Sequence, residues 1–431
     1  MFSIRDPLWS TIPVEPFARE LIDTPAFQRL RNVRQLGLAY LVYPGATHSR
    51  LEHALGTYHL ARRALGLLDE SGALDDELRA DAGVVRAAAL LHDIGHYPFS
   101  HALEEIGAIH HEEVARPLIT TGAIADRLSR SLGPDAPERV MALIRGRSDC
   151  ALQGLISGSL DLDKIEYLRR DILMCGVGHV GVDADRLLNS LTVLTDPDTG
   201  RRRIGLVEKG LAALESLLFA KYQMYRNVYW HHTVRSATVM YMRLVSDALD
   251  AGSIEAAALA GYTDEALLAR LERDHPSPLL TALRERRLYK RSFECPAAHL
   301  TGDDCEWIAD DRALAARVEA ALEHELGLAP GTLLLDYPVK TQMLGLDIPL
   351  LRRDGVTMRL DARGWSGAID LPKLSEELYR SARWLRVFTA DRAAIPAAPL
   401  LRFLRRPATE VRVAVDRGEK LLGLWGERVR G

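Results

Sequence analysis

Apolar residues recur at helical spacing through most of the first half of the chain. A period of about 3.6 residues is the signature of an amphipathic helix. The helices predicted on this basis span residues 14–30, 50–68, 84–92, 110–119, 137–144 and 160–173. A longer helix is predicted over 211–247, and shorter ones between 251 and 287. The pattern is typical of a mainly α protein.

Short runs of strand-forming residues interrupt the helical pattern. Residues 192–195 and 203–207 flank the turn-forming stretch Asp196-Pro-Asp-Thr-Gly, which predicts a small β-hairpin. Further strands are predicted at 332–337, 355–360 and 384–389. We therefore expect a helical core over residues 1–248 and a C-terminal helical and α+β lobe over 249–431, packed on the core as one body.

The most informative break in the apolar pattern is His92-Asp93, which ends an apolar stretch of helix. Two more histidines, His96 and His101, follow closely. Desolvating an ionisable group is costly unless something compensates, and a metal ion is the strongest compensation available. A single His-Asp pair is weak evidence by itself, because core histidines often bond to a neighbouring carboxylate.

Other segments carry matching chemistry. Arg50 and His53 share a helical face at i, i+3. Asp163, Tyr167 and Asp171 follow one side of a later predicted helix at i, i+4, i+8. Imidazoles and carboxylates together suit a divalent transition metal better than calcium or a structural cysteine-rich zinc site.

The ordered series His53, His92-Asp93 and Asp163 resembles the metal ligand set of the HD-domain phosphohydrolases. With its flanking residues, the chain is similar to the HD-domain dNTP triphosphohydrolases, and the matching blocks run from about Asp23 to Lys290. The resemblance implies an HD-domain helical core and one divalent transition metal (Mn, Fe or Zn), with additional Mg arriving with the nucleotide. It also implies hydrolysis of a dNTP to a deoxynucleoside and triphosphate.

The same resemblance implies roles for the clustered histidines. His101 is the first candidate to protonate the leaving 5′ oxygen, because an alkoxide leaving group needs a nearby acid. His96 and His111 are expected to assist as phosphate contacts or proton relays. A simpler alternative for His111 is that it only caps the helix that follows.

Basic residues at matching positions are expected to bind the triphosphate, since a guanidinium fork and an ammonium both suit phosphate oxygens. These are Arg50, Lys164 and Lys221.

The sugar is expected to contact a separate group of residues. Tyr229 matches an aromatic residue that packs under the sugar and leaves no room for a 2′-hydroxyl, although simple core packing is the alternative. Gln35 and Asp171 match groups that bond the 3′-hydroxyl. Tyr167 completes the predicted substrate-binding residues.

A further block suggests regulation by a nucleotide. Asp23, Gln28 and Arg31 match a segment that binds a guanine nucleotide between subunits, and Arg286 and Lys290 match a basic motif that contacts its phosphates. Together they imply activation by dGTP or GTP and a homo-oligomer, a dimer or a tetramer. Each block by itself reads equally as a solvated, charged helix face.

The composition of the chain limits which partners and which cellular compartment are expected. The net charge of −4 gives no electrostatic footprint for generic nucleic-acid binding, so a nucleic-acid partner is not expected. The 4 cysteines are widely spread, which favours a reducing cytoplasm over a disulfide framework. No apolar run approaches the roughly 20 residues of a membrane span, and the N-terminus does not read as a signal peptide. We expect a cytoplasmic protein with no membrane contact.

Two other functions stay open at this stage. One is an HD phosphohydrolase acting on another phosphoester, such as a nucleoside monophosphate, an alarmone or a nucleic-acid end. The other is a nucleic-acid-binding or scaffolding protein whose metal is structural.

Overall fold

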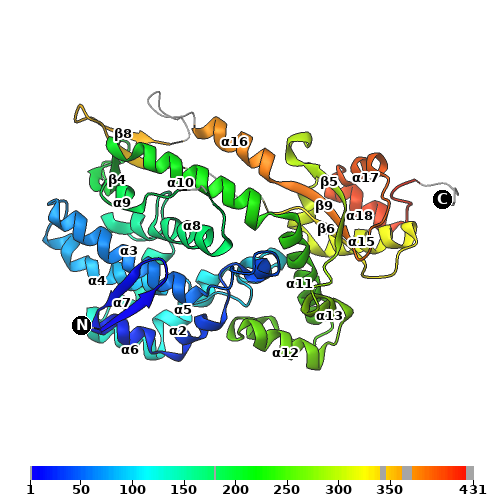
Figure 1. Ribbon diagram of the computed structural model, residues 1–431, viewed down its shortest axis with the longest axis horizontal. Coiled ribbons are helices and arrows are strands. Elements are labelled where there is room, and N and C mark those ends of the chain that lie inside the picture. The colour runs from blue at the N-terminus through cyan, green and yellow to red at the C-terminus, as the bar shows by residue number, and fades with distance from the viewer. Residues whose placement is uncertain (1, 179–180, 340–345, 362–370, 424–431) are drawn as a thin grey trace.

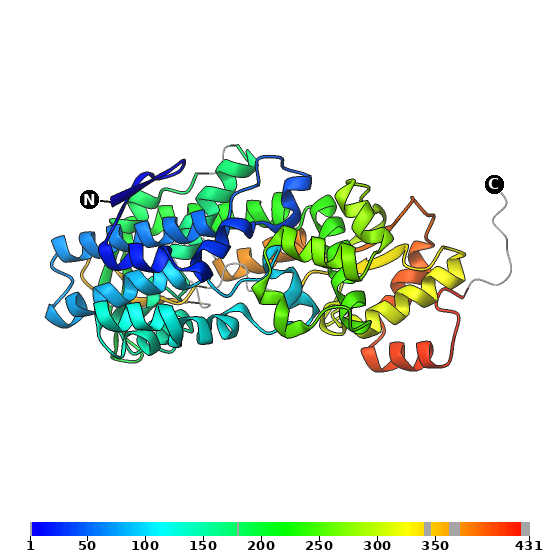
Figure 2. The same ribbon diagram turned by 90° about the horizontal axis from the view of Figure 1, so that it is seen from below.

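A computed structural model describes residues 2–178, 181–339, 346–361 and 371–423 of the chain. Helices dominate the described part, which confirms the predicted mainly α class. The molecule is elongated, and the two chain termini lie at opposite ends (Figures 1 and 2).

The N-terminal half is a helical core behind a small antiparallel hairpin of β1 (Phe2–Asp6) and β2 (Ser10–Val14). Its helices are α1 (Pro16–Ile22), α2 (Pro25–Arg29), α3 (Arg50–Glu70), α4 (Asp76–Leu91), α5 (His111–Thr120), α6 (Gly122–Leu132), α7 (Ala136–Ile144), α8 (Leu162–Cys175) and α9 (Ala184–Leu188). One predicted helix, 14–30, is broken in two. Thr24 caps α2 through its side chain and Pro25 occupies the first turn, so a new helix begins there.

Helix α3 packs against both α4 and α8. The proposed ligands lie on α3, on α8 and directly after the end of α4. The apolar faces of these helices belong to the largest hydrophobic cluster of the described residues, which includes fully buried Leu60, Leu90 and Ile165. Helix α3 begins with a capping box: Ser49 and Glu52 satisfy each other's backbone amides. The start of α3, where Arg50 and His53 lie, is therefore fixed firmly.

The long helix predicted over 211–247 is interrupted. It divides into α10 (Leu211–Met224), a π-helical turn (Tyr225–Tyr229) and α11 (His232–Asp250). The sequence did not reveal the break because apolar and aromatic residues, among them Met224, Val228 and Trp230, continue across it. Such turns frequently mark functional sites.

The C-terminal part begins along α11, whose buried side chains join those of α12 (Asp264–Asp274) and α13 (Pro278–Arg284) in a second hydrophobic cluster. The remaining helices are α14 (Trp307–Asp310), α15 (Arg312–Leu326), α16 (Leu371–Ala382), α17 (Ala397–Leu404) and α18 (Ala408–Asp416). The division at residue 248 stays a prediction.

Two further sheets complete the described fold. The predicted hairpin forms from β3 (Leu191–Thr195) and β4 (Arg202–Val207), and β4 pairs in parallel with β7 (Ile348–Leu351), which pairs with β8 (Thr357–Leu360). The other sheet has the order β5-β9-β6, from Lys290–Pro296, Trp384–Thr389 and Leu333–Asp336. Strands from the last third of the chain thus complete both sheets: β7 and β8 extend the hairpin of β3 and β4, and β6 and β9 form the sheet with β5. None of the described helices has the length and apolar character that a membrane crossing requires.

Candidate metal centre and active-site cavity

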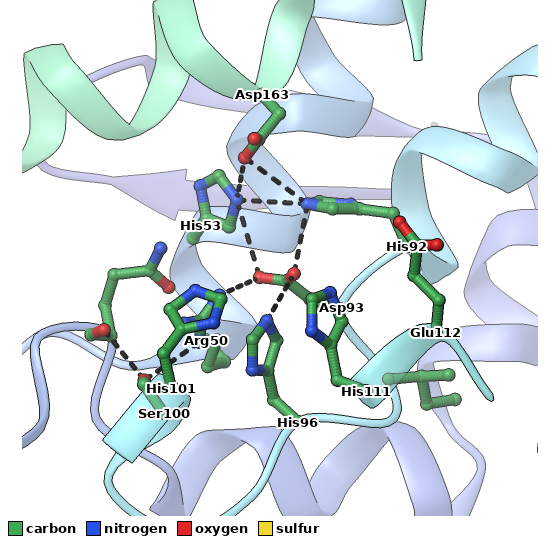
Figure 3. A network of polar contacts seen from close by, with 12 residues as sticks. Arg50, His53, His92, Asp93, His96, Ser100, His101, His111, Glu112 and Asp163 are labelled. Atoms are coloured by element: carbon green, nitrogen blue, oxygen red, sulfur yellow. Dashed lines mark hydrogen bonds and ion pairs between the residues drawn. The ribbon is translucent and has the colours of Figure 1, made fainter. Parts of the chain in front are cut away.

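The four side chains predicted as metal ligands face one another (Figure 3). His53, His92 and Asp93 offer ligand atoms within 4.8 Å of one another, and Asp163 lies beside the two histidines. His53 Nε2 lies 3.1 Å from His92 Nε2 and 2.9 Å from an Asp163 oxygen. The Asp93 carboxylate lies 3.5 Å from His53 Nε2 and 3.4 Å from His92 Nε2. Donors about 2.1 Å from a shared ion and at right angles to each other are roughly 3 Å apart, so these spacings suit one cation.

The hydrogen bonds behind the two histidines direct their lone pairs toward this candidate ion site. His53 Nδ1 donates to Glu166 at 2.6 Å, and His92 Nδ1 donates to the Ala89 carbonyl at 2.9 Å. With the proton on Nδ1, each Nε2 presents a lone pair. Two lone pairs 3.1 Å apart, flanked by two carboxylates, repel one another unless a positive charge lies between them. The donor set therefore fits a divalent transition metal.

The local electrostatics agree with a positive charge at this point. Burial lowers the pKa of His53, but Asp163, Glu166 and Asp93 outweigh it and raise that pKa to about 10. Burial raises the pKa of Asp163, but His53 and His92 hold it well below its usual range. The carboxylates are thus ionised and retain a cation, either a proton or a metal ion.

A glycine lets the buried Glu166 reach His53. A Cβ on Gly56 would lie 2.0 Å from Glu166 Oε1, so α3 and α8 can approach this closely only without a side chain there. Glu166 is fully buried and also pairs with Arg170 at 2.7 Å, which in turn pairs with Asp6 at 3.0 Å. This chain of charges fixes the carboxylate that orients His53.

The three other predicted catalytic histidines form a second group beside the ligands. The His96 and His111 rings stack with centroids 3.8 Å apart, and the His101 ring lies 4.6 Å from that of His96. Glu104 connects them, because its carboxylate accepts from His101 Nδ1 at 2.9 Å and from His111 Nδ1 at 2.7 Å. His96 Nε2 lies 3.1 Å from Asp93, which joins this group to the ligands.

The alternative role for His111, a helix cap, is taken by its neighbour. His110 is the N-cap of α5 and accepts from the Glu112 amide, whereas His111 turns toward Glu104. Gly95 allows α5 to come this close, since a Cβ there would lie 2.1 Å from the His111 carbonyl oxygen. The tight turn after His92-Asp93 thereby brings two separated histidine segments together.

These groups line a cavity of about 850 Å³, which is large enough for a nucleotide. Among its lining residues are Gln35, Arg50, His92, Asp93, His96, His101, Glu104, His111, Asp163, Lys164, Tyr167, Asp171, Tyr225, Tyr229 and Trp230. Arg50 Nη1 donates to Asp93 at 2.6 Å and its Nε donates to Ser100 at 3.1 Å. Arg50 therefore holds a metal ligand in addition to facing the cavity where the triphosphate is expected.

The residues predicted to contact the sugar lie together. Asp171 accepts from Tyr229 Oη at 2.6 Å and from His48 Nε2 at 2.7 Å, and both Asp171 and His48 are buried. Gln35 is 8% exposed, and its Oε1 has no hydrogen-bond partner within the described residues. A buried amide oxygen in a cavity wall needs a donor, which a ligand or an ordered water in the cavity can supply.

The two predicted lysines differ. Lys164 Nζ donates to Asp161 at 2.5 Å and to the Gly158 carbonyl at 2.9 Å, on the cavity wall. Lys221 is buried, with its ammonium 6.0 Å from the centre of the Tyr225 ring. Burial and the charge of Lys164 lower the pKa of Lys221 to about 8. An anionic ligand in the cavity would reverse that effect.

The residues predicted to bind an activator are not among those that line the active-site cavity. Asp23 pairs with Arg19 at 3.8 Å, and Arg31 donates to Gln28 at 3.1 Å. Arg286 donates to the Leu41 carbonyl at 2.6 Å, and Lys290 is an exposed residue at the start of β5. Their role in nucleotide binding stays a prediction.

Sequence reasoning missed three residues of the site: Glu166, Glu104 and His48. Glu166 follows Asp163 by one helical turn, and Glu104 follows His101 by the same interval. That spacing could have signalled a supporting carboxylate beside each functional residue. His48 offered no such signal, because its partner Asp171 is distant in sequence.

Comparison with known proteins agrees with this geometry. Residues 50–149 match the HD domain and residues 182–363 match the HD associated region. An uncharacterized protein of Methanocaldococcus jannaschii is 39% identical over 67% of this chain and 58% of its own length. A protein of Dictyostelium discoideum named deoxynucleoside triphosphate triphosphohydrolase SAMHD1 homolog is 28% identical over 72% of this chain and 63% of its own length. The matched region thus spans little more than half of these relatives.

A crystal structure from Bacteroides thetaiotaomicron, titled as a phosphohydrolase, has a TM-score of 0.70 at 23% identity and covers 91% of this chain and 100% of its own. At that identity the likeness shows the fold alone. The resemblance drawn from the sequence is confirmed by the two matched regions and by the named relative. The chain belongs to the HD-domain family, with an HD domain followed by an HD associated region.

Proposed function

We propose that this protein is a metal-dependent dNTP triphosphohydrolase, which converts a dNTP and water to a deoxynucleoside and triphosphate. The observation that carries the proposal is the position of the cavity. Its wall includes three of the four candidate ligands, His92, Asp93 and Asp163, together with the Asp171–Tyr229 pair. The same wall includes Gln35, whose side-chain oxygen is unsatisfied. Phosphate chemistry and sugar recognition can therefore operate on one bound molecule. The name of the Dictyostelium relative supports the same substrate class.

The metal would be held by His53, His92, Asp93 and Asp163. When bound, it lowers the pKa of a coordinated water and offsets charge on the phosphoryl oxygens. Mn, Fe and Zn all suit this donor set, and Mg can accompany the nucleotide. Glu166 and Arg50 keep two of the ligands in place through the short bonds described above.

The chain's own residues supply the remaining requirements. His101 is the proposed proton donor to the leaving 5′ oxygen, because Glu104 binds its Nδ1 and leaves Nε2 for that transfer. His96 and His111 complete the wall beside it. Lys164 contributes positive charge from the cavity wall, and Lys221 contributes it from behind Tyr225, a residue of that wall. An anion bound nearby would raise the lowered pKa of Lys221.

Sugar selection would rest on three bonded residues, the buried His48 and Asp171 and the half-buried Tyr229. The 3′-hydroxyl donates to Gln35 or Asp171, and the Tyr229 ring is held by its own bond to Asp171. We propose that this fixed ring excludes a 2′-hydroxyl, so that deoxynucleotides are preferred over ribonucleotides.

A panel of nucleotides tests the proposal. The purified protein, loaded separately with Mn, Fe, Zn or Mg, is incubated with dNTPs, NTPs, nucleoside monophosphates and an alarmone, and the products are identified by ion-exchange chromatography. Triphosphate released from dNTPs supports the proposal. Turnover confined to monophosphates or alarmones would favour the other phosphohydrolase reaction. Absence of turnover by a metal-loaded protein would favour a structural metal.

Regulation by nucleotide is part of the proposal. Asp23, Gln28 and Arg31 on one face and Arg286 and Lys290 on another would bind dGTP or GTP between subunits of a homo-oligomer. Light scattering and dNTP hydrolysis are measured with and without dGTP. Growth of the assembly together with higher activity supports activation, whereas unchanged mass and flat kinetics would contradict it.

A further inference from the structure

The 3-10 helix Ser100–Ile106 has side chains that bond to two different parts of the molecule. His101 and Glu104 belong to the histidine group of the active site. The next residue, Glu105, bonds instead to Arg235 on the first turn of α11. Arg235 Nη1 and Nη2 donate to the two Glu105 oxygens, each at 2.9 Å. The segment that holds the proposed proton donor is therefore tied to α11 by a two-pronged ion pair.

The same guanidinium also binds the C-terminal sheet. Arg235 Nη2 donates to Asp336 Oδ1 at 2.7 Å, and Nε lies 3.2 Å from both Asp336 oxygens. Asp336 is the last residue of β6 and is fully buried. One side chain, itself 4% exposed, thus joins the catalytic segment to a strand more than two hundred residues away in sequence.

Further charges surround this junction. Arg312 of α15 lies 3.6 Å from Glu105, and Arg386 of β9 lies 4.0 Å from Asp336. Burial raises the pKa of Glu105, but Arg235 outweighs it and keeps that pKa below its ordinary value. Buried ion pairs stabilise a fold little better than apolar residues of the same volume. A network of this size is therefore better explained by the geometry it imposes than by its contribution to stability.

The backbone that leads into the segment is strained and anchored by a second carboxylate. Phe99 and Ser100 both adopt positive φ, 58° and 66°, which is unfavourable for residues other than glycine. Asp264, at the start of α12, accepts from the Phe99 amide at 2.8 Å. Strain of this kind persists only where the surroundings fix it. The C-terminal part of the chain supplies a fixing contact at each end of the segment.

Direct binding of substrate phosphate by Arg235 is a weaker explanation of its place in the cavity wall. Its Nε, Nη1 and Nη2 groups are already engaged by two carboxylates at short distances. The positive charge of this guanidinium is already neutralised by the two carboxylates, and few of its N–H groups are free to bind an incoming anion.

We propose that Arg235 is a positioning residue, through which the C-terminal part of the chain holds His101 and Glu104 in their working geometry. The proposal rests on the proposed function, since those two residues acquire a catalytic role only there. Misplacing a catalytic group by about 1 Å costs on the order of a hundredfold in rate. Loosening the Arg235 junction should therefore lower kcat and leave KM nearly unchanged.

The test compares Arg235→Lys with a matched control, Arg243→Lys, in the full chain. Lysine keeps the charge but cannot bind two carboxylates through a planar fork. Arg243 lies further along the same helix and pairs with Glu319 of α15 without contacting the catalytic segment. Both variants are measured for kcat, KM, metal content, thermal stability and amide hydrogen exchange at residues 100–106.

The expected result for Arg235→Lys is a kcat lowered roughly tenfold to a hundredfold, with unchanged KM and metal content and faster exchange at residues 100–106. Arg243→Lys should lower thermal stability comparably and leave kcat and that exchange unchanged. Equal kcat losses in both variants, or unchanged exchange and kcat in Arg235→Lys, would overturn the proposal.

Two additions keep the test decisive. If Arg235→Lys does not fold, Glu105→Gln and Asp336→Asn loosen the same junction from its two sides, and both should reproduce the kcat loss. If the unaltered protein hydrolyses no nucleotide, the proposed function fails by itself. The exchange experiment, with NMR of the His101 side chain, then still reports whether Arg235 fixes the His101–Glu104 bond.

Discussion

Replacing Glu166 by glutamine should weaken metal binding without touching a metal ligand. Glu166 accepts the Nδ1 proton of His53 at 2.6 Å and is fully buried. It thereby holds the His53 lone pair toward the other ligands. Glutamine keeps the shape but removes the charge, so the charge-assisted bond becomes a neutral one.

The magnitude follows from that bond. Loss of a partner that orients a metal-bound histidine typically lowers metal affinity by about 10-fold to 100-fold, or about 1.4 to 2.8 kcal/mol. The short distance and complete burial here point to the upper part of that range. The glutamine also leaves Arg170 with a weaker partner, so some loss of thermal stability accompanies the effect.

The assay is competition for Mn or Zn against a chromophoric chelator, with the fold checked by circular dichroism. Two other variants sharpen it. Gly56→Ala should also weaken metal binding, because its new Cβ would lie 2.0 Å from Glu166 Oε1 and displace that carboxylate. Glu104→Gln should leave metal affinity unchanged and lower kcat, since Glu104 bonds to His101 and His111.

Equal metal affinities of folded Glu166→Gln and the unaltered protein would contradict this role of Glu166. It is also contradicted if Glu104→Gln weakens metal binding as strongly as Glu166→Gln. Either result would mean that the bond behind His53 does not shape the metal centre.

Other consequences can be checked separately. Tyr229→Ala should admit ribonucleotides, raising the ratio of ATP to dATP turnover at least tenfold, whereas an unchanged ratio would refute the steric role. His48→Asn should weaken discrimination between dNTPs and 2′,3′-dideoxy substrates, measured as kcat/KM, because Asp171 loses the imidazole that fixes it. Chelation of the metal should lower the melting temperature, because an ion that binds the folded state stabilises it, and added Mn should restore it. Burial raises the pKa of Glu319 to about 7, above its unfolded value near 4.5. Its contribution to stability is therefore present in acid and lost as pH rises through about 7, and Glu319→Gln should flatten the dependence of unfolding free energy on pH between about 5 and 8.

Much of the helical architecture follows from apolar periodicity and capping residues. Ser49 and Glu52 mark the start of α3, and the turn after Thr195 marks the hairpin, as the sequence indicates. Local patterns also indicate the candidate metal centre in outline. His92-Asp93 ends an apolar stretch of helix, and Asp163 shares one helix face with Tyr167 and Asp171.

Most features that the sequence did not predict depend on contacts between distant segments. The pairing of β4 with β7 and the Arg235 junction bring together residues far apart in the chain, and periodicity carries no information about them. The π-helical turn at Tyr225–Tyr229 was hidden because aromatic residues continue through it. His48 was overlooked for the same kind of reason, since its function depends on where Asp171 lies in space.

The proposed reaction is attack of water on the α-phosphorus of a dNTP in this cavity, where His53, His92, Asp93 and Asp163 would hold the metal and His101 would protonate the leaving 5′ oxygen. Hydrolysis in ¹⁸O-enriched water, followed by ³¹P NMR and mass spectrometry of the products, tests it most directly. The account predicts triphosphate with the label on a terminal phosphoryl group and an unlabelled deoxynucleoside. Label in the nucleoside, or release of pyrophosphate or orthophosphate in place of triphosphate, would contradict it.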